Sequence, residues 1–127
     1  MKIVMRVVKG PEVGREYIFP AEGESGNDPT DILVGRDDAD SQARWLMSRE
    51  DPTVSRSHFL LEIRPPNCYV QDKGSRNGVY LRRGAEPERP VTREILLNGD
   101  RLRLGNTVVE FEISVPQIPI HAEAYTP

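Results

Sequence analysis

The sequence predicts an all-β fold of the sandwich or barrel class, and three observations support this prediction. Apolar and β-branched residues come in short runs, turn-forming residues separate the runs, and no long segment shows the 3.6-residue apolar period of a helix. Many short strands at this spacing are typical of antiparallel sandwiches and barrels. With 127 residues, the chain is long enough for one domain with its own core.

Eight segments are predicted to form strands, because each combines β-forming residues with flanking turn residues. They are Lys2–Val8, Glu16–Phe19, Asp31–Val34, His58–Arg64, Cys68–Asp72, Val79–Arg82, Arg101–Leu104 and Thr107–Ile113. In two of them apolar residues occupy every second position, as in a half-buried strand: Phe59, Leu61 and Ile63, then Val109, Phe111 and Ile113. Gly105-Asn106 lies between the last two strands and predicts a tight hairpin.

Two connections are less regular than the rest. Residues 21–34 begin with an acidic, glycine-containing loop before a strand. The long connection 37–53 is predicted to carry a short helical turn around Ala43–Met47, with Trp45 and Leu46 in a small satellite core.

Composition narrows the class of protein. Residues 1–114 are expected to form the domain, and 115–127, with three prolines, an extended tail. A net charge of −3 does not suit nucleic acid or an acidic membrane surface. One cysteine, Cys68, and two histidines leave no internal disulfide and no zinc-like cluster, so no metal or other cofactor is expected. No apolar run is long enough for a signal peptide or a membrane span, which favours a cytoplasmic protein.

Arginine is unusually common among the basic residues, at 14 of 17. A GC-rich genome would produce this bias without any functional cause. Arginine is also the better phosphate ligand, because its planar guanidinium bonds two oxygens at once. Only the positions of the arginines can separate these explanations.

Three short loop motifs follow in order, each next to a predicted strand: Gly35-Arg36, Ser55-Arg56-Ser57-His58 and Ser75-Arg76-Asn77-Gly78. They offer guanidinium, hydroxyl and carboxamide groups, all of which hold an anion, together with glycines that let the backbone approach closely. This combination predicts a receptor for a phosphorylated peptide rather than a catalytic site.

The segments ILVGR, TVSRSHFLLEI, CYVQDKGSRNGVYL and LLNGDRLRLGNTVVEFEI together resemble a forkhead-associated (FHA) domain. The resemblance covers about Met1 to Ser114, nearly all of the predicted domain. It implies an antiparallel β-sandwich of about eleven strands with recognition loops at one end. It also implies binding of phosphothreonine peptides, without catalysis.

Five residues are expected to bind the phosphopeptide: Arg36, Ser55, Arg56, Arg76 and Asn77. Arg36 would make a charge-assisted contact with phosphate, Ser55 would donate its hydroxyl, and the Asn77 carboxamide would bond the peptide main chain. Each has a structural alternative. In particular, Arg36 could pair with a nearby aspartate of the Asp37, Asp38 and Asp40 group, Ser55 could cap a turn, and Asn77-Gly78 could be a plain turn.

Four further residues of these motifs are expected to shape the loops: Gly35, His58, Ser75 and Gly78. By resemblance, His58 holds loop backbone by hydrogen bonds. A hydrolase using Ser55 or Ser57 with His58 is disfavoured, because residues this close in sequence rarely give the geometry of a nucleophile and its base.

The sequence departs from the common family pattern in three places. Val79 stands where threonine often follows Asn-Gly, and Arg76 stands where serine or threonine often contacts phosphate. The Arg36–Ser55 connection is longer than usual and is expected to reshape the peptide groove. Arg56, Arg76 and the pair Arg82-Arg83 are expected to read residues that follow the phosphothreonine.

The expected partner is a phosphothreonine-containing protein or peptide, either a Ser/Thr kinase or its substrate, with no nucleic acid and no membrane insertion. The alternative is a phosphate-independent scaffold or oligomerisation domain that retains the fold. Thr126-Pro127 in the tail is a further candidate phosphosite for the same domain.

Overall fold

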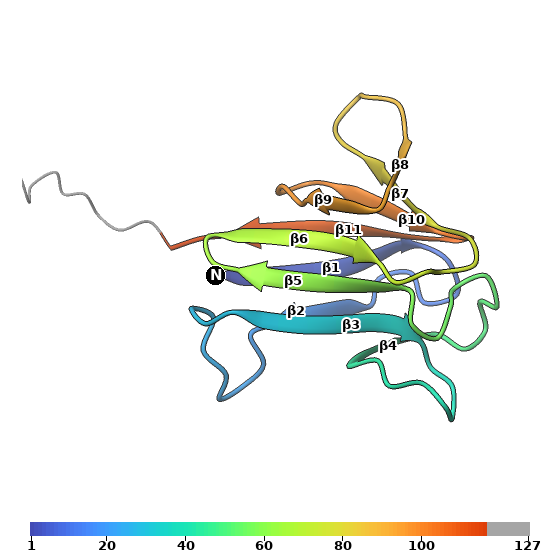
Figure 1. Ribbon diagram of the computed structural model, residues 1–127, viewed down its shortest axis with the longest axis horizontal. Helices are drawn as coiled ribbons and strands as arrows, with labels where there is room; N and C mark the ends of the chain where they lie inside the picture. Colours follow the sequence, from blue (N-terminus) through green and yellow to red (C-terminus); the bar gives the residue numbers. More distant parts are fainter. Residues whose placement is uncertain (117–127) are drawn as a thin grey trace, which may run out of the picture.

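The computed structural model describes residues 1–116, which contain eleven strands and no helix (Figure 1). The strands are β1 (Lys2–Lys9), β2 (Glu16–Phe19), β3 (Thr30–Arg36), β4 (Trp45–Met47), β5 (Phe59–Arg64), β6 (Asn67–Asp72), β7 (Val79–Arg82), β8 (Arg89–Val91), β9 (Arg93–Ile95), β10 (Arg101–Leu104) and β11 (Thr107–Ser114). This part of the chain has no helix long and apolar enough to cross a membrane.

Two sheets make up the sandwich. One has six strands in the order β2-β1-β11-β10-β7-β8, and the other has five in the order β4-β3-β5-β6-β9. Neighbouring strands pair antiparallel except β3 and β4, which run parallel, with Val34 opposite Trp45. The predicted sandwich is confirmed, with one parallel pair added to the expected antiparallel pattern.

The core lies between the sheets and consists of the side chains on the inward-facing side of each strand. Phe19, Phe59 and Phe111 are fully buried within it and come from β2, β5 and β11. The predicted alternation holds in β5, where every second residue is buried, because such a strand presents one face to the partner sheet.

All eight predicted strands are present, and their ends differ from the prediction by at most two residues. The predicted hairpin is also confirmed, since Leu104 pairs with Thr107 across a two-residue turn and Gly105 has a φ of 65°. Glycine adopts this left-handed conformation without the steric cost of a Cβ.

The helical turn predicted at Ala43–Met47 is wrong, since β4 occupies Trp45–Met47. Pairing with β3 decides the conformation, because Arg44 N donates to Leu33 O at 2.9 Å and Asp37 N donates to Met47 O at 2.7 Å. Trp45 is buried in the main core rather than in a satellite, and its ring lies 5.7 Å from that of Tyr17.

Strands β8 and β9 were not predicted from the sequence. Like β4, each has three residues and lies at the edge of a sheet. Such strands are too short to show a period, and they form because a neighbouring strand offers free backbone groups.

Four connections meet at one end of the sandwich, away from the N-terminus (Figure 1). They are residues 37–44 between β3 and β4, 48–58 between β4 and β5, 73–78 between β6 and β7, and the turn 105–106. We refer to this part of the molecule as the loop end. The predicted tail, with Thr126-Pro127, lies outside the described residues except for its first two positions.

Candidate functional site

The loop end is built on a close backbone contact at Gly35. A Cβ at this position would lie far inside van der Waals contact with the carbonyl oxygen of Arg56. Glycine therefore lets the 48–58 connection lie against the end of β3. Arg36 N then donates to Ser55 O at 2.9 Å, and His58 N donates to Val34 O at 2.9 Å.

His58 joins two of the loops through its ring. The side chain is fully buried, Ser55 N donates to its Nδ1 at 3.0 Å, and its Nε2 lies 2.8 Å from Gly78 O. Because Nδ1 accepts a hydrogen bond, the ring is neutral and carries its proton on Nε2, which donates to Gly78. Burial lowers the pKa of His58, only partly offset by the bond to Gly78 and by the Asp72 and Asp51 carboxylates.

Ser55 connects the second and third motifs. Its Oγ accepts a hydrogen bond from Arg76 N at 3.0 Å, which leaves the hydroxyl proton free to be donated elsewhere. Ser75 N donates to Asp72 Oδ1 at 2.9 Å and fixes the start of the same loop. Ser75 Oγ is buried and has no hydrogen-bond partner within residues 1–116.

Arg36 is held by one of its terminal nitrogens. Nη1 donates to Val54 O at 2.7 Å and more weakly to Pro52 O at 3.4 Å. Nη2 lies 3.5 Å from Asp38 Oδ2, so the predicted alternative of an aspartate pair is present in this structure. The backbone contacts of Nη1 fix the guanidinium in place, and Nη2 is left to contact Asp38 in the 37–44 connection.

Arg56 shares the same carboxylate. Its Nε lies 3.3 Å from Asp38 Oδ2, and its side chain is about half exposed. The two guanidinium groups thus converge on one oxygen. A backbone bond from Asp40 N, at 3.0 Å, reaches the other oxygen of Asp38. This backbone bond is the main reason that the pKa of Asp38 is lowered, followed by Arg56 and Arg36.

Asn77 belongs to a network that sequence analysis missed. Its carboxamide donates to Thr53 O at 2.8 Å. Thr53 N donates to Asp51 Oδ1 at 2.9 Å, and the hydroxyls of Thr53 and Thr107 donate to the same buried carboxylate. Burial disfavours the ionised form of Asp51, but these bonds outweigh it and lower its pKa. The Asp51-Pro52-Thr53 spacing, which is typical of an Asx turn, was the available signal.

Twelve of the 14 arginines form ion pairs within the described residues. The exceptions in that part of the chain are Arg76, in the third motif, and Arg82, at the far end of β7. Arg83, which was expected to read peptide residues, pairs with Asp100 at 2.8 Å and donates to Ile95 O, so it fastens the loop after β7.

The structure therefore brings all five predicted binding residues to the loop end. The family model for the FHA domain matches residues 32–105, which is more than half of the chain. The chain belongs to the FHA domain family. The match runs from within β3 to the turn before β11, and it includes all three loop motifs.

The chain is similar in sequence to one characterised protein and similar in fold to solved FHA structures. The chain is 28% identical over 101 residues to the glycogen accumulation regulator GarA of Mycolicibacterium smegmatis, covering 78% of this chain and 51% of GarA. It thus spans about half the length of that relative. A solved FHA domain from work on phosphothreonine-dependent FHA interactions has a TM-score of 0.68 at 21% identity, with 91% of this chain and all of that one covered. Mycobacterium tuberculosis EmbR, solved with a low-affinity phosphopeptide, has a TM-score of 0.64 at 19% identity, with 92% and 26% covered.

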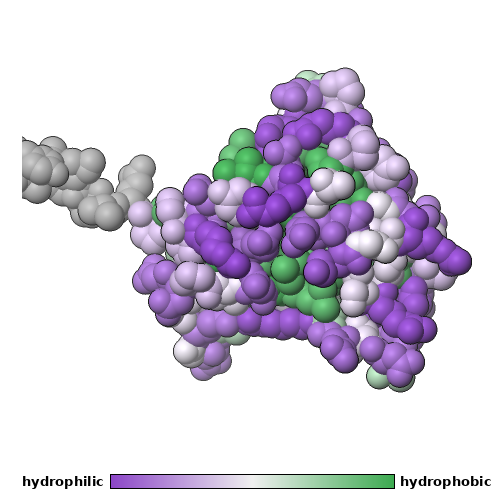
Figure 2. Space-filling view, in the orientation of Figure 1, coloured by the Kyte–Doolittle hydropathy of each residue, from purple (hydrophilic) through white to green (hydrophobic). Residues whose placement is uncertain are grey.

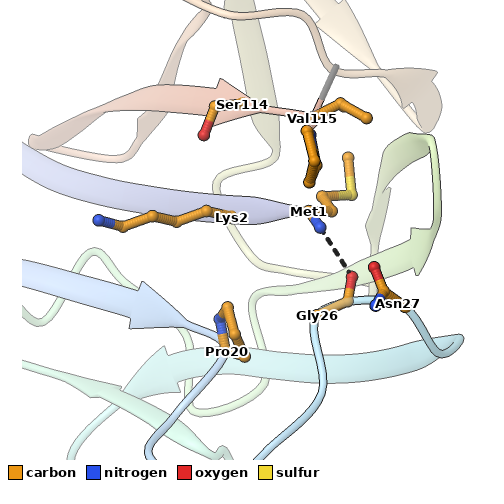
Figure 3. Close-up of a pocket in the computed structure, with 8 residues that line it drawn as sticks. Met1, Lys2, Pro20, Gly26, Asn27, Ser114 and Val115 are labelled. Carbon is orange, nitrogen blue, oxygen red and sulfur yellow. Dashed lines mark hydrogen bonds between the residues drawn. The ribbon is translucent and has the colours of Figure 1, made fainter. Parts of the chain in front are cut away.

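A separate hollow of about 380 Å³ lies at the opposite end of the sandwich, where β1 begins and β11 ends (Figure 3). Met1, Pro20 and Val115 line it, and the Met1 ammonium group donates to Gly26 O at 2.9 Å. Its lining includes Lys2 and Ser114 but no residue of the three loop motifs, so the candidate site is the loop end. Hydrophilic residues predominate over the face of the sandwich shown in Figure 2. Residues 1–116 bring together no group of acidic, histidine or cysteine side chains suited to a metal ion.

Proposed function

We propose that this FHA domain is a phosphothreonine-dependent peptide-binding module without catalytic activity, acting in Ser/Thr kinase signalling. The observation that supports this most directly is that Arg36 Nη2 and Arg56 Nε converge on one oxygen of Asp38. Ser55, which precedes Arg56 in the same loop, keeps a hydroxyl proton free to donate. A phosphothreonine carries nearly two negative charges and three acceptor oxygens, and these donors match them.

Preorganisation supports the same proposal. Arg36 is anchored by Val54 O, Ser55 by Arg76 N, and Asn77 by Thr53 O, so the donors are in place before a ligand arrives. A shallow site gains affinity in this way, because little side-chain entropy is lost on binding. We expect affinities of about micromolar, since one phosphate and a few side chains bury little area.

The geometry of His58 argues against hydrolysis. A general base needs a free nitrogen lone pair within reach of the nucleophile. The Nδ1 lone pair of His58 is already used by Ser55 N, and Nε2 faces Gly78 O. The family is a binding module, and this site has the features of one.

The proposed partner is a protein or peptide phosphorylated on threonine, either a Ser/Thr kinase or its substrate, with no role for nucleic acid or membrane insertion. The cytoplasm, where kinases find ATP, is the proposed place of action. Arg76 is exposed and forms no ion pair with the described residues, so it is the candidate for contacts beyond the phosphate.

Binding to degenerate phosphothreonine, phosphoserine and unphosphorylated peptide libraries tests the proposal. Selective capture of phosphothreonine peptides is expected. Arg36→Ala should then weaken binding by about 10-fold to 150-fold, the value of one charge-assisted hydrogen bond. Arg76→Ala should weaken it more than Arg82→Ala, which removes the same charge at the end of β7 that lies away from the 73–78 connection. Equal capture from all three libraries would instead favour the phosphate-independent scaffold.

A further inference from the structure

Asp38 occupies the position where the two arginines of the site converge. Its Oδ2 lies 3.5 Å from Arg36 Nη2 and 3.3 Å from Arg56 Nε. Its Oδ1 accepts a hydrogen bond from Asp40 N at 3.0 Å, which fixes the direction of the carboxylate. A negatively charged oxygen thus already faces the donors that the proposed function assigns to phosphate.

The contacts of Asp38 are weak enough to be exchanged. Charge-assisted hydrogen bonds between guanidinium and carboxylate are normally about 2.7–2.9 Å long, and both of these are longer. The side chain of Arg56 is 54% exposed and that of Asp38 is 26% exposed, so solvent screens the pair. Arg36 would keep its position without Asp38, because Nη1 remains bonded to Val54 O.

A phosphoryl group would satisfy the same donors better than the carboxylate does. It brings nearly two charges and three oxygens, whereas a carboxylate brings one charge and two oxygens. The site therefore exchanges one anion for a stronger one when a phosphopeptide binds. The net free energy of phosphate binding is reduced by the cost of releasing Asp38 and by the repulsion between two anions held close together.

We propose that Asp38 is an internal competitor that holds the guanidinium groups of Arg36 and Arg56 until a phosphorylated ligand displaces it. This inference rests on the proposed function. It makes Asp38 a residue that lowers the affinity for phosphopeptides and so sets the threshold of phosphate charge needed for binding.

The test uses the whole chain and the best phosphothreonine peptide from the library, with affinity measured by calorimetry. Asp38→Asn removes the charge but keeps an oxygen that can accept from Asp40 N. The matched control is Asp37→Asn, which removes the same charge from the adjacent residue, whose nearest cation is Arg49 at 3.5 Å. Melting curves of both variants establish that they are folded.

Asp38→Asn is expected to tighten phosphopeptide binding by about threefold to tenfold, the value of releasing two partly exposed ion pairs. Asp37→Asn should change it by less than about twofold, because solvent and salt screen a charge that contacts neither arginine of the site. In an Arg56→Ala background the gain from Asp38→Asn should shrink, since a double-mutant cycle reports direct coupling.

Weaker binding by Asp38→Asn would overturn the inference and make Asp38 a residue that orders the loop. Equal tightening by Asp37→Asn would also overturn it, because overall charge would then explain the effect. If the unsubstituted chain bound phosphothreonine peptides no better than unphosphorylated ones, the proposed function itself would fail, and the inference with it.

Discussion

His58 offers the sharpest test of how the loop end is held together, through the substitution His58→Ala. This change removes the ring that accepts from Ser55 N and donates to Gly78 O, and it leaves a cavity at a fully buried position. A buried polar group without a partner costs about 1–3 kcal/mol, and two partly buried groups, Ser55 N and Gly78 O, would lose their partner here. Allowing for partial relaxation and water entry, we expect a loss of about 3–5 kcal/mol in the free energy of unfolding.

That loss is a large share of the total stability of a small domain, which is about 5–15 kcal/mol. It should lower the melting temperature by roughly 10–20 °C, as measured by circular dichroism. Phosphopeptide affinity, measured well below that melting temperature, should also fall by about tenfold or more. The loops that contain Ser55 and Gly78 are then no longer joined through the ring of His58. Ser57→Ala is the control, since this exposed neighbour lies in the same loop.

The pH dependence gives an independent check on His58. Burial lowers the pKa of the folded histidine below the value of about 6.5 that it has in the unfolded chain. The unfolded chain therefore takes up a proton first as pH falls. Stability from this residue is complete above about pH 6.5 and declines below it, by at most about 1.4 kcal/mol per pH unit, until the folded histidine also protonates.

His58→Ala should lack this decline below about pH 6.5. A His58→Ala protein that melts within about 2 °C of the original and binds peptide equally well would refute the role of His58 as the link between the loops.

Three other predictions concern residues around the site and in the core. Gly35→Ala, whose added methyl would clash with the carbonyl oxygen of Arg56, should lower the free energy of unfolding in urea by about 1–3 kcal/mol and weaken phosphopeptide binding. An unchanged unfolding midpoint would contradict the close contact. Arg83→Ala should cost about 2–4 kcal/mol, because it leaves Asp100 buried without its cation, whereas Arg82→Ala should be nearly neutral by the same measurement. Burial raises the pKa of the Cys68 thiol to about 12, so thiol reagents should label it only when the protein is unfolded, and rapid labelling under native conditions would argue against its burial.

The strands with a clear period of two could be predicted from the residue pattern alone. In β5 and β11 the alternation of apolar residues is local information, because a half-buried strand needs it whatever its neighbours are. The three loop motifs were also visible, since each lies within or directly beside a strand that could be predicted. The residue pattern of the strands and the order of the three motifs were enough to predict the fold class and the candidate residues of the site.

Which side chains are free to bind a ligand, and which are already paired within the protein, depends on contacts that only the folded chain makes. Arg76 and Arg83 are the same residue type, and the sequence alone does not distinguish them. In the structure Arg76 is exposed at the loop end, whereas Arg83 is paired with buried Asp100, which lies 17 positions further along the chain. The Asp51 and Thr107 bond has the same origin, joining residues 56 positions apart. The short edge strand β4 likewise depends on β3, since its pairing is set by contacts that form only when the chain has folded.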